Sequence, residues 1–501
     1  MIKGTPIFIF NSLDTVRGGL TKAVLTRANF FADYFEDVII LTLKFQPNFR
    51  KIINELYSSG MLDKRVKVLN FFDDIKEEKV LKKKIKWSPL FKVKERGYAV
   101  FKDKKQKLPS YRYYKNGLYV KYKRFDKNYN LLFIDYMNEG RHRYRRDEFD
   151  ENGILVRTRH MDLVHNKPKL DRYFDSKGKC YLSVWLDMNG NQNRTVYLKN
   201  EYKEYNSLQA FCIEWLEKQI SKTAYPILFS DSRSTDDLIL NIKNKSAKKI
   251  AVLHNNHFAA PYDETGNIRK SWEPFFNNID SFDVVIFLTV EQKEDIIKQF
   301  GEQTKYLVIP HFVKKINVES THYNPKLVVS LTRYDPQKRL DEAIRAFKHV
   351  VKEIPEAEYH IYGFGPQEED LKKLIHELNL DKNVKLMGFT TNPTKIYQSA
   401  ACSILTSDYE GFGMAITESL AAGTPVIAYD IKYGPKEIIR HGVDGFLVPK
   451  GDTKKLADRI IEILKNKELR EALSNNSRDV FVRFSEQKYQ ESWLTLLKNL
   501  F

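Results

Sequence analysis

The segment Ser407–Asp430, SDYEGFGMAITESLAAGTPVIAYD, decides the fold of this chain. The apolar run CSILTSD that leads into it predicts a β-strand, and GMAITESLAAG predicts a helix that Gly423 ends. The apolar run PVIAYD then predicts a second strand. Strand, helix and strand in this order form the repeating unit of a parallel sheet. The segment therefore predicts an α/β fold.

Two carboxylates flank the glycine-rich elbow of this segment. Glu410 lies in the predicted loop and Glu418 about two turns into the predicted helix, with seven residues between them. Gly411 and Gly413 let a ligand approach the backbone, and the free N–H groups at the helix start favour an anion. We expect one carboxylate to accept hydrogen bonds from sugar hydroxyls and the other from a ribose diol.

Two cations follow an earlier predicted strand. The run SLTRYDPQKRLDEAI places Arg333 and Lys338 in a loop that leads into a helix. Paired cations at a helix start suit a diphosphate, because their charge adds to the helix dipole. Stabilising the charge of a departing diphosphate is commonly the largest single contribution to lowering the activation barrier. Ordinary surface cations would give the same pattern, so the assignment depends on the elbow as well.

A metal could stabilise the same charge, but the sequence contains no Asp-x-Asp pair. His254 and His257, in LHNNHF, end a predicted strand without a Cys or Glu at ligand spacing. Burial in a structural role is an equal alternative for either histidine. We therefore expect no metal and no other cofactor.

The rest of the chain extends the α/β reading into two domains with an insertion. Strands alternate with helices in residues 1–78 and 206–315, which predicts an N-terminal Rossmann-like domain. Residues 79–205 instead carry a turn signal about every 12 residues, such as FDKNYN, FDENGI, FDSKGK and LDMNGN, which predicts a β-meander insertion. A second Rossmann-like series covers 316–482, and 483–501 predict a helix that packs back on the N-terminal domain. Two doubly wound domains of this kind place a crevice at the carboxyl ends of their strands.

Composition narrows the class of protein and its partners. The chain has 501 residues, 42% of them hydrophobic, and no apolar run near the ~20 residues of a membrane span. Three separated cysteines form neither a disulfide framework nor a metal knuckle, so we expect a cytoplasmic protein. Most of the net charge of +18 lies in residues 76–124, where 18 Lys and Arg stand against 4 Asp and Glu. This basic segment predicts a polyanionic or anionic-surface partner, with a solvated face as the alternative.

These motifs together carry a family resemblance. The two Rossmann-like halves, GGLTKA after the first strand, R-x4-K and E-x7-E resemble the retaining GT-B glycosyltransferases of the glycogen-synthase-like family. The β-meander insertion, LHNNHF, GFTTNP, YEGFGM and AYDIKYGP are closer still to the staphylococcal wall teichoic acid α-glycosyltransferases. The likeness covers essentially the whole chain. It implies metal-independent transfer of glucose or N-acetylglucosamine from UDP-glucose or UDP-GlcNAc to poly(ribitol phosphate) or poly(glycerol phosphate), with retention.

The resemblance also implies residue roles, which are matched motif by motif. Gly18 and Gly19 would border the donor phosphates and sugar, and Arg333 with Lys338 would hold the diphosphate. Glu410 and the backbone of Phe412, Gly413 and Met414 would bind the hexose, Glu418 the ribose, and the segment around Phe389 the uracil. His257 would line the site beside the transferred sugar, and the chain departs from the family at His311, where Asn is frequent. A homotrimer built by the insertion is implied as well.

Other readings stay open on the sequence. A closely related family transfers N-acetylglucosamine to Ser or Thr of serine-rich adhesins with a similar insertion. A glycosidase also uses two carboxylates, but the diphosphate cations would then have no role. The basic segment could bind nucleic acid, although we expect no nucleic-acid partner, or it could dock the protein on the anionic inner membrane face.

Overall fold

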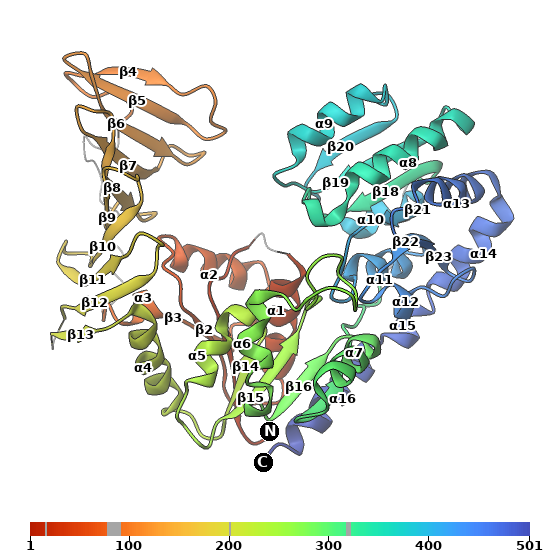
Figure 1. Ribbon diagram of the computed structural model, residues 1–501, viewed down its shortest axis with the longest axis horizontal. Coiled ribbons are helices and arrows are strands. Elements are labelled where there is room, and N and C mark those ends of the chain that lie inside the picture. Colours follow the sequence, from red (N-terminus) through yellow and green to blue (C-terminus); the bar gives the residue numbers. More distant parts are fainter. Residues whose placement is uncertain (16–17, 78–91, 200–201, 317–321) are drawn as a thin grey trace. The chain divides into compact units, whose positions relative to one another are not determined.

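The computed structural model describes residues 1–15, 18–77, 92–199, 202–316 and 322–501 (Figure 1). The chain divides into two compact units. Unit 1 comprises Lys3–Phe229 and Ser234–Ala247, and unit 2 comprises Ser230–Arg233 and Lys248–Phe501. The four predicted sequence regions are not separate units in this division.

Parallel strands form the α/β part of unit 1. β1 pairs with β14 and β2, and β2 pairs with β3. All six residues of β1 are buried, as expected for a strand covered on both faces. The elements are β1 (Thr5–Phe10), α1 (Gly19–Phe31), β2 (Val38–Thr42), α2 (Phe49–Ser58), β3 (Val66–Asn70), α3 (Phe71–Asp74), α4 (Leu208–Ile220), β14 (Pro226–Ser230) and α5 (Asp236–Leu240).

The predicted all-β insertion is confirmed as a ten-stranded sheet in the order β13-β12-β11-β10-β9-β8-β7-β6-β5-β4. Strands adjacent in the chain are adjacent in the sheet, which makes it a meander. Oδ1 of the turn residues Asp126, Asp150, Asp175 and Asp187 each accepts two backbone N–H bonds. The strands are β4 (Ala99–Lys102), β5 (Ser110–Lys115), β6 (Leu118–Phe125), β7 (Leu131–Met137), β8 (Arg143–Phe149), β9 (Leu155–Met161), β10 (Pro168–Phe174), β11 (Cys180–Leu186), β12 (Gln192–Tyr197) and β13 (Lys203–Tyr205).

Unit 2 begins with three further parallel strands, and β16 pairs with β15 and β17. They belong to a seven-stranded sheet with the order β17-β16-β15-β14-β1-β2-β3. The strands that follow β1 in the chain are added on one side of it up to β3 and on its other side from β14 onward. The direction in which strands are added therefore reverses between β1 and β14. The elements are β15 (Lys248–Leu253), α6 (Glu273–Phe276), β16 (Val284–Phe287), α7 (Val290–Phe300) and β17 (Lys305–Val308).

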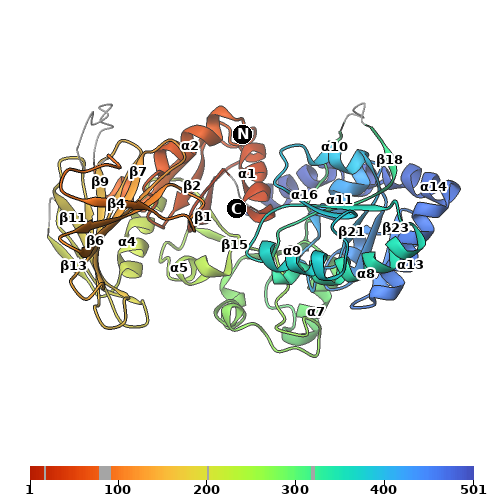
Figure 2. The ribbon, with the colours of Figure 1, turned by 90° about the horizontal axis from the view of Figure 1, so that it is seen from above.

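The second sheet of unit 2 is parallel and has the order β20-β19-β18-β21-β22-β23. In Figure 2, α8, α9 and α13 lie on one side of it and α10 and α11 on the other. The strand order changes direction between β18 and β21. Ligands of such sheets bind at the carboxyl ends of the strands next to this point. The elements are β18 (Asn324–Leu331), α8 (Leu340–Glu353), β19 (Glu358–Tyr362), α9 (Glu368–Glu377), β20 (Val384–Gly388), α10 (Pro393–Gln398), β21 (Ala400–Leu405), α11 (Met414–Ala421), β22 (Val426–Asp430), α12 (Pro435–Ile438), β23 (Gly445–Pro449), α13 (Thr453–Lys465), α14 (Lys467–Ser477) and α15 (Val480–Arg483).

The last helix, α16 (Glu486–Lys498), has the predicted cap, because the Ser485 side chain accepts from the backbone N–H of Lys488. Its Tyr489 ring lies 4.8 Å from the ring of Phe312, in the segment after β17.

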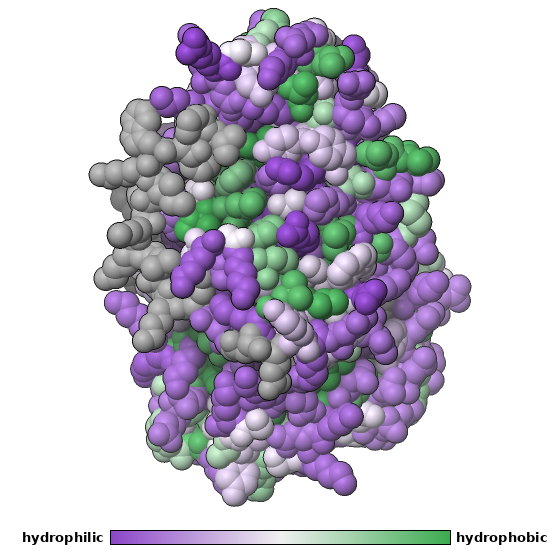
Figure 3. Space-filling model, turned by 90° about the vertical axis from the view of Figure 1, so that its left-hand side faces the viewer, coloured by the Kyte–Doolittle hydropathy of each residue, from purple (hydrophilic) through white to green (hydrophobic). Residues whose placement is uncertain are grey.

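The surface on the side of the insertion is mainly hydrophilic, with hydrophobic residues scattered among polar ones (Figure 3). None of the described helices has both the length and the apolar character to cross a bilayer. Part of the predicted basic segment, including Lys82, Lys83, Lys84 and Lys86, lies outside the described residues.

Candidate functional site

The elbow after β21 holds Glu410 by both its side chain and its backbone. Its carboxylate accepts from Nζ of Lys338 and Oγ of Ser407, both at 2.6 Å. Its backbone exchanges hydrogen bonds with Lys432 and Tyr433 at 3.1 and 3.0 Å. The side chains of Lys338 and Glu410 are 14% and 13% exposed, so this ion pair is shielded but still open to a ligand. The structure therefore joins two residues to which the sequence assigned separate roles.

The glycines of the elbow are required by packing. A Cβ on Gly411 would lie 2.0 Å from the backbone oxygen of His254, and Gly413 has φ +95° where it caps α11. Helix α11 spans only eight residues, so Glu418 lies just over one turn from its start rather than two. Gly423, at φ +81°, follows the helix as predicted. The elbow is thus a tight backbone corner against the end of β15.

The cation loop after β18 is fastened to this elbow. Nε2 of Gln337 donates to the backbone oxygen of Tyr409 at 2.8 Å. Nη1 of Arg333 donates to Asp335 at 2.9 Å, and the Arg333 side chain is 55% exposed. Lys338 ends a short 3-10 helix, Pro336–Lys338, just before α8. The loop therefore presents one shielded and one exposed cation at the carboxyl end of the sheet.

A histidine pair that the sequence left unassigned adjoins the elbow. Nε2 of His254 lies 2.7 Å from Oδ1 of the buried Asp231. Its ring stacks on His311 with centroids 5.5 Å apart, and His311 meets Phe412 edge-on at 5.5 Å. A carboxylate bound to one ring nitrogen fixes the tautomer and the orientation of an imidazole. His311, which the resemblance singles out, therefore contacts both His254 and the elbow.

His257, by contrast, is fully buried among aromatic rings. Its ring centroid lies 4.1 Å from that of Phe258 and 6.0 Å from that of Tyr433, and Trp272 and Phe276 complete the cluster at 6.1 and 5.6 Å. Burial lowers the pKa of His257 to about 4, so the ring is neutral near pH 7. Its role beside the transferred sugar stays a prediction.

Two exposed aromatic rings stand at the ends of neighbouring strands. Phe389 follows β20 and is 61% exposed, and Phe364 follows β19 and is 51% exposed. Their centroids are 6.1 Å apart with the planes at 67°. A Cβ on Gly363 would lie 1.8 Å from the backbone oxygen of Thr332, so the chain can turn here only with glycine. Large rings held in solvent in this way suit stacking on a base.

A small pocket lies between the cation loop and the elbow, with Lys338, Thr406, Ser407 and Ala415 in its wall. Burial, and then the charge of Glu418, raise the pKa of Tyr397, which also lines the pocket. The structure therefore gathers most of the predicted donor-site residues at one reversal point: Arg333, Lys338, Glu410, Phe412, Gly413, Met414 and Glu418.

Gly18 and Gly19 lie in unit 1, both exposed. Gly18 caps α1 and Gly19 is its first residue. In the part of the chain that the structure describes, no side chain caps this 13-residue helix, so its N-terminal N–H groups suit an anion.

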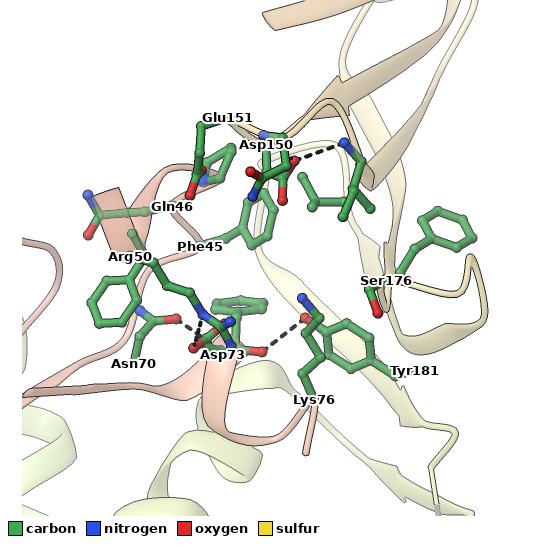
Figure 4. Close-up of a pocket in the computed structure, with 17 residues that line it drawn as sticks. Phe45, Gln46, Arg50, Asn70, Asp73, Lys76, Asp150, Glu151, Ser176 and Tyr181 are labelled. Atoms are coloured by element: carbon green, nitrogen blue, oxygen red, sulfur yellow. Dashed lines mark hydrogen bonds and ion pairs between the residues drawn. The ribbon is translucent and has the colours of Figure 1, made fainter. Parts of the chain in front are cut away.

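Two of the cavities in unit 1 share Phe45. The first lies between the segments after β2 and β3 and two insertion turns (Figure 4). There Arg50 pairs with Asp73 at 3.1 Å, and burial raises the pKa of the Glu151 carboxyl. The second, which is roomier, lies at the carboxyl ends of β1 and β2 against β9, β10 and β12.

Within the described ranges, no three His, Cys, Asp or Glu side chains form a group that could hold a metal ion. Sequence reasoning also missed two groups. Asp231 follows β14 in FSDS, and Phe364 lies in YGFG, where an aromatic residue between two glycines signals a tight exposed turn.

Family comparison agrees with this geometry. The family "Glycosyl transferases group 1" matches residues 313–480, and "Glycosyl transferase 1 domain A" matches residues 7–202. The poly(glycerol-phosphate) α-glucosyltransferase of Bacillus subtilis is 31% identical over 98% of this chain and 75% of its own length.

The poly(ribitol-phosphate) α-N-acetylglucosaminyltransferase of Staphylococcus aureus is 30% identical over 98% of both chains. A structure of a variant of S. aureus TarM with fondaparinux, α-GlcNAc-glycerol and UDP superimposes with a TM-score of 0.84 at 29% identity, over 99% of this chain and 100% of the other. These matches run the full length of the chain, insertion included. The chain belongs to the family of GT-B wall teichoic acid α-glycosyltransferases that act on poly(glycerol phosphate) or poly(ribitol phosphate).

Proposed function

We propose that this protein transfers glucose or N-acetylglucosamine from a UDP-sugar to hydroxyls of a poly(ribitol phosphate) or poly(glycerol phosphate) chain, with retention. The observation that carries the proposal is the Lys338–Glu410 pair at the reversal point between β18 and β21. A cation that binds diphosphate and a carboxylate that binds sugar must lie side by side if one UDP-sugar contacts both. The two full-length relatives support the same donor and acceptor classes.

The donor contacts follow from the chemistry of each group. Lys338 and the exposed Arg333 supply positive charge for the diphosphate, and the N-terminal N–H groups of α11 add to it. Glu410 accepts hydrogen bonds from hexose hydroxyls, Glu418 from the ribose, and Phe389 with Phe364 stacks on the uracil. When the donor binds, its phosphates compete with Glu410 for Lys338, which frees the carboxylate for the sugar.

Retention without a protein nucleophile completes the proposal. The acceptor hydroxyl attacks the anomeric carbon from the face that the diphosphate leaves, and a diphosphate oxygen takes its proton. The C–O bond to the diphosphate breaks as the new glycosidic bond forms. Arg333 and Lys338 stabilise the departing charge, so the step requires no divalent ion in this proposal.

A donor and acceptor screen tests the function. Purified poly(ribitol phosphate), poly(glycerol phosphate) and a serine-rich adhesin peptide are each incubated with UDP-glucose or UDP-GlcNAc. UDP release is followed, and the products are identified by mass spectrometry. We expect transfer to one of the polymers. Transfer to the peptide alone would select the adhesin-directed alternative, and UDP release with no acceptor modified would refute the proposal.

We also propose a cytoplasmic homotrimer assembled by the insertion, with peripheral contact with the anionic inner membrane face. The exposed Phe101 and Leu118, at 58% and 43%, support an association surface on the insertion. Light scattering of the full chain should give three times the mass of 59.0 kDa. The protein should sediment with anionic liposomes and not with neutral ones. A monomeric mass would refute the trimer, and equal sedimentation with both kinds of liposome would refute the membrane contact.

A further inference from the structure

Two rows of side chains cross one face of the insertion sheet. Residues that lie directly opposite each other on paired strands share a face. The first row is Arg112, Tyr122, Asp135, Arg146, Arg159 and Asp171, on β5 to β10. The second row is Arg124, Phe133, Glu148, Arg157 and Tyr173, on β6 to β10. We call these two sets the arginine rows.

At β9 and β10 the rows reach the second of the two cavities that share Phe45. Arg157, Arg159, Asp171 and Tyr173 line that cavity. Its opposite wall includes Asn11, which follows β1 and donates to Oγ of Ser234, beyond β14, at 2.7 Å. Winding reverses between these two strands, so the cavity occupies the position where such sheets bind ligands. The loop that begins at Asn11 leads to Gly18 at the start of α1.

The arginines are held in place by carboxylates before any ligand arrives. Nε and Nη2 of Arg146 donate to the two oxygens of Asp135 at 2.7 Å, and Arg159 makes the same bidentate pair with Asp171 at 2.7 Å. Nη1 of each guanidinium has no protein partner among the described residues, so it can donate to another acceptor. A guanidinium fixed in this way loses little side-chain freedom when it binds a phosphate.

The same arginines cover the aromatic rings of the rows. The Arg146 guanidinium lies 3.9 Å from the centroid of Phe133, and that of Arg124 lies 5.4 Å from it. A ring already covered by cations is a poor platform for stacking bases, on which single-stranded nucleic acid depends. The rows therefore favour a polyanion that has regular phosphates and no bases.

We propose that this cavity, at the carboxyl ends of β1 and β2, holds the repeat being glycosylated and that the arginine rows bind the phosphates of neighbouring repeats. This inference rests on the proposed polyol phosphate acceptor. Three inter-strand steps separate β9 from β6, which is roughly 14 Å of track beyond the cavity. Several phosphate contacts along one chain act together, so a long polymer should bind better than a short one.

Kinetics with acceptors of two lengths test the rows. The acceptor is whichever polymer the wild type uses, poly(glycerol phosphate) or poly(ribitol phosphate). Arg146→Gln should raise KM for long chains of this polymer by about fivefold. The increase in KM should be smaller for an acceptor of a single repeat. Arg145→Gln is the matched control. Arg145 is the adjacent residue of β8, also pairs with an aspartate at 2.6 Å, and lies opposite Tyr136 and His160 on the other face. KM for polymer should not change in this control.

Arg124→Gln provides a second arm, because among the described residues Arg124 hydrogen-bonds only the neutral Ser110 and Gln106, and its loss leaves no described carboxylate unpaired. It should raise KM for long chains more than for single repeats, and 0.5 M NaCl should reduce its difference from wild type. Equal KM for polymer in Arg146→Gln, Arg124→Gln and Arg145→Gln would overturn the proposal, as would stronger competition by DNA than by teichoic acid. Absence of transfer by the wild type would instead refute the proposed function.

Discussion

The shielded pair of Lys338 and Glu410 gives the sharpest prediction, because its removal has two separable effects. Glu410→Ala and Lys338→Ala should each lower turnover at least ~100-fold, the scale of one lost transition-state contact. That factor corresponds to about 2.7 kcal/mol in the activation barrier. Each variant should also lose stability, since the remaining charge is largely shielded and has lost its partner.

The size of the stability loss follows from burial. Removing one partner of a buried ion pair costs about 3–5 kcal/mol. Both side chains keep 13–14% of their exposure, so we expect the lower end of that range. The double variant should recover part of the loss, because neither charge is then left alone.

The assay measures UDP release and the urea unfolding midpoint of each variant, with turnover read at a temperature where all variants are folded. Lys372→Ala is the matched control, because Lys372 is half exposed and also pairs with two glutamates, at 3.0 and 2.9 Å. It should cost under about 1 kcal/mol and leave turnover unchanged. Near-wild-type turnover in Glu410→Ala or Lys338→Ala would refute the assignment of the donor site.

Three further predictions use the same protein. Full turnover should persist in excess EDTA, because Arg333 and Lys338 supply the charge; a requirement for added Mg²⁺ or Mn²⁺ would contradict this. Phe389→Ala should raise KM for the UDP-sugar roughly 5- to 150-fold, the scale of one lost base–aromatic stack, whereas an unchanged value would remove the ring from the uracil site. The folded-state pKa of His257, about 4, is below the usual 6.5 of an unfolded chain, so stability should fall as pH drops through that interval, by about 3 kcal/mol in total. The difference between the unfolding midpoints at pH 7 and pH 4.5 should therefore be smaller for His257→Phe than for the wild type. If the two proteins show the same difference, His257 is not the group that titrates.

The sheets and the insertion could be predicted because their signals are local. Apolar runs such as Thr5–Phe10 read directly as buried parallel strands, and Asp-containing turns marked each hairpin of the meander. The length of α11 was overestimated, since Gly413 at φ +95° delays its first turn until Met414.

The contacts within the site could not be read from the sequence, because they join distant segments. His254 meets Asp231 across 23 residues, and Lys338 meets Glu410 across 72. The arginine rows depend on strand register, and several bulges shift that register within the insertion. Charge composition therefore indicated a polyanion partner without indicating which cations share a face.

The repetition of the insertion has a consequence for how this sheet can change in size. Phe125, Phe149 and Phe174 end β6, β8 and β10, and each is followed by an aspartate that closes the next turn in the same way. One such two-strand module is about 24 residues long, and within the sheet it pairs with the next strands along its two edges. Duplicating or deleting a module would lengthen or shorten the sheet by roughly 9–10 Å while leaving the pairing of the strands on either side of it unchanged. The sheet is therefore built so that its reach can change in whole hairpin increments without a redesign of the catalytic domains.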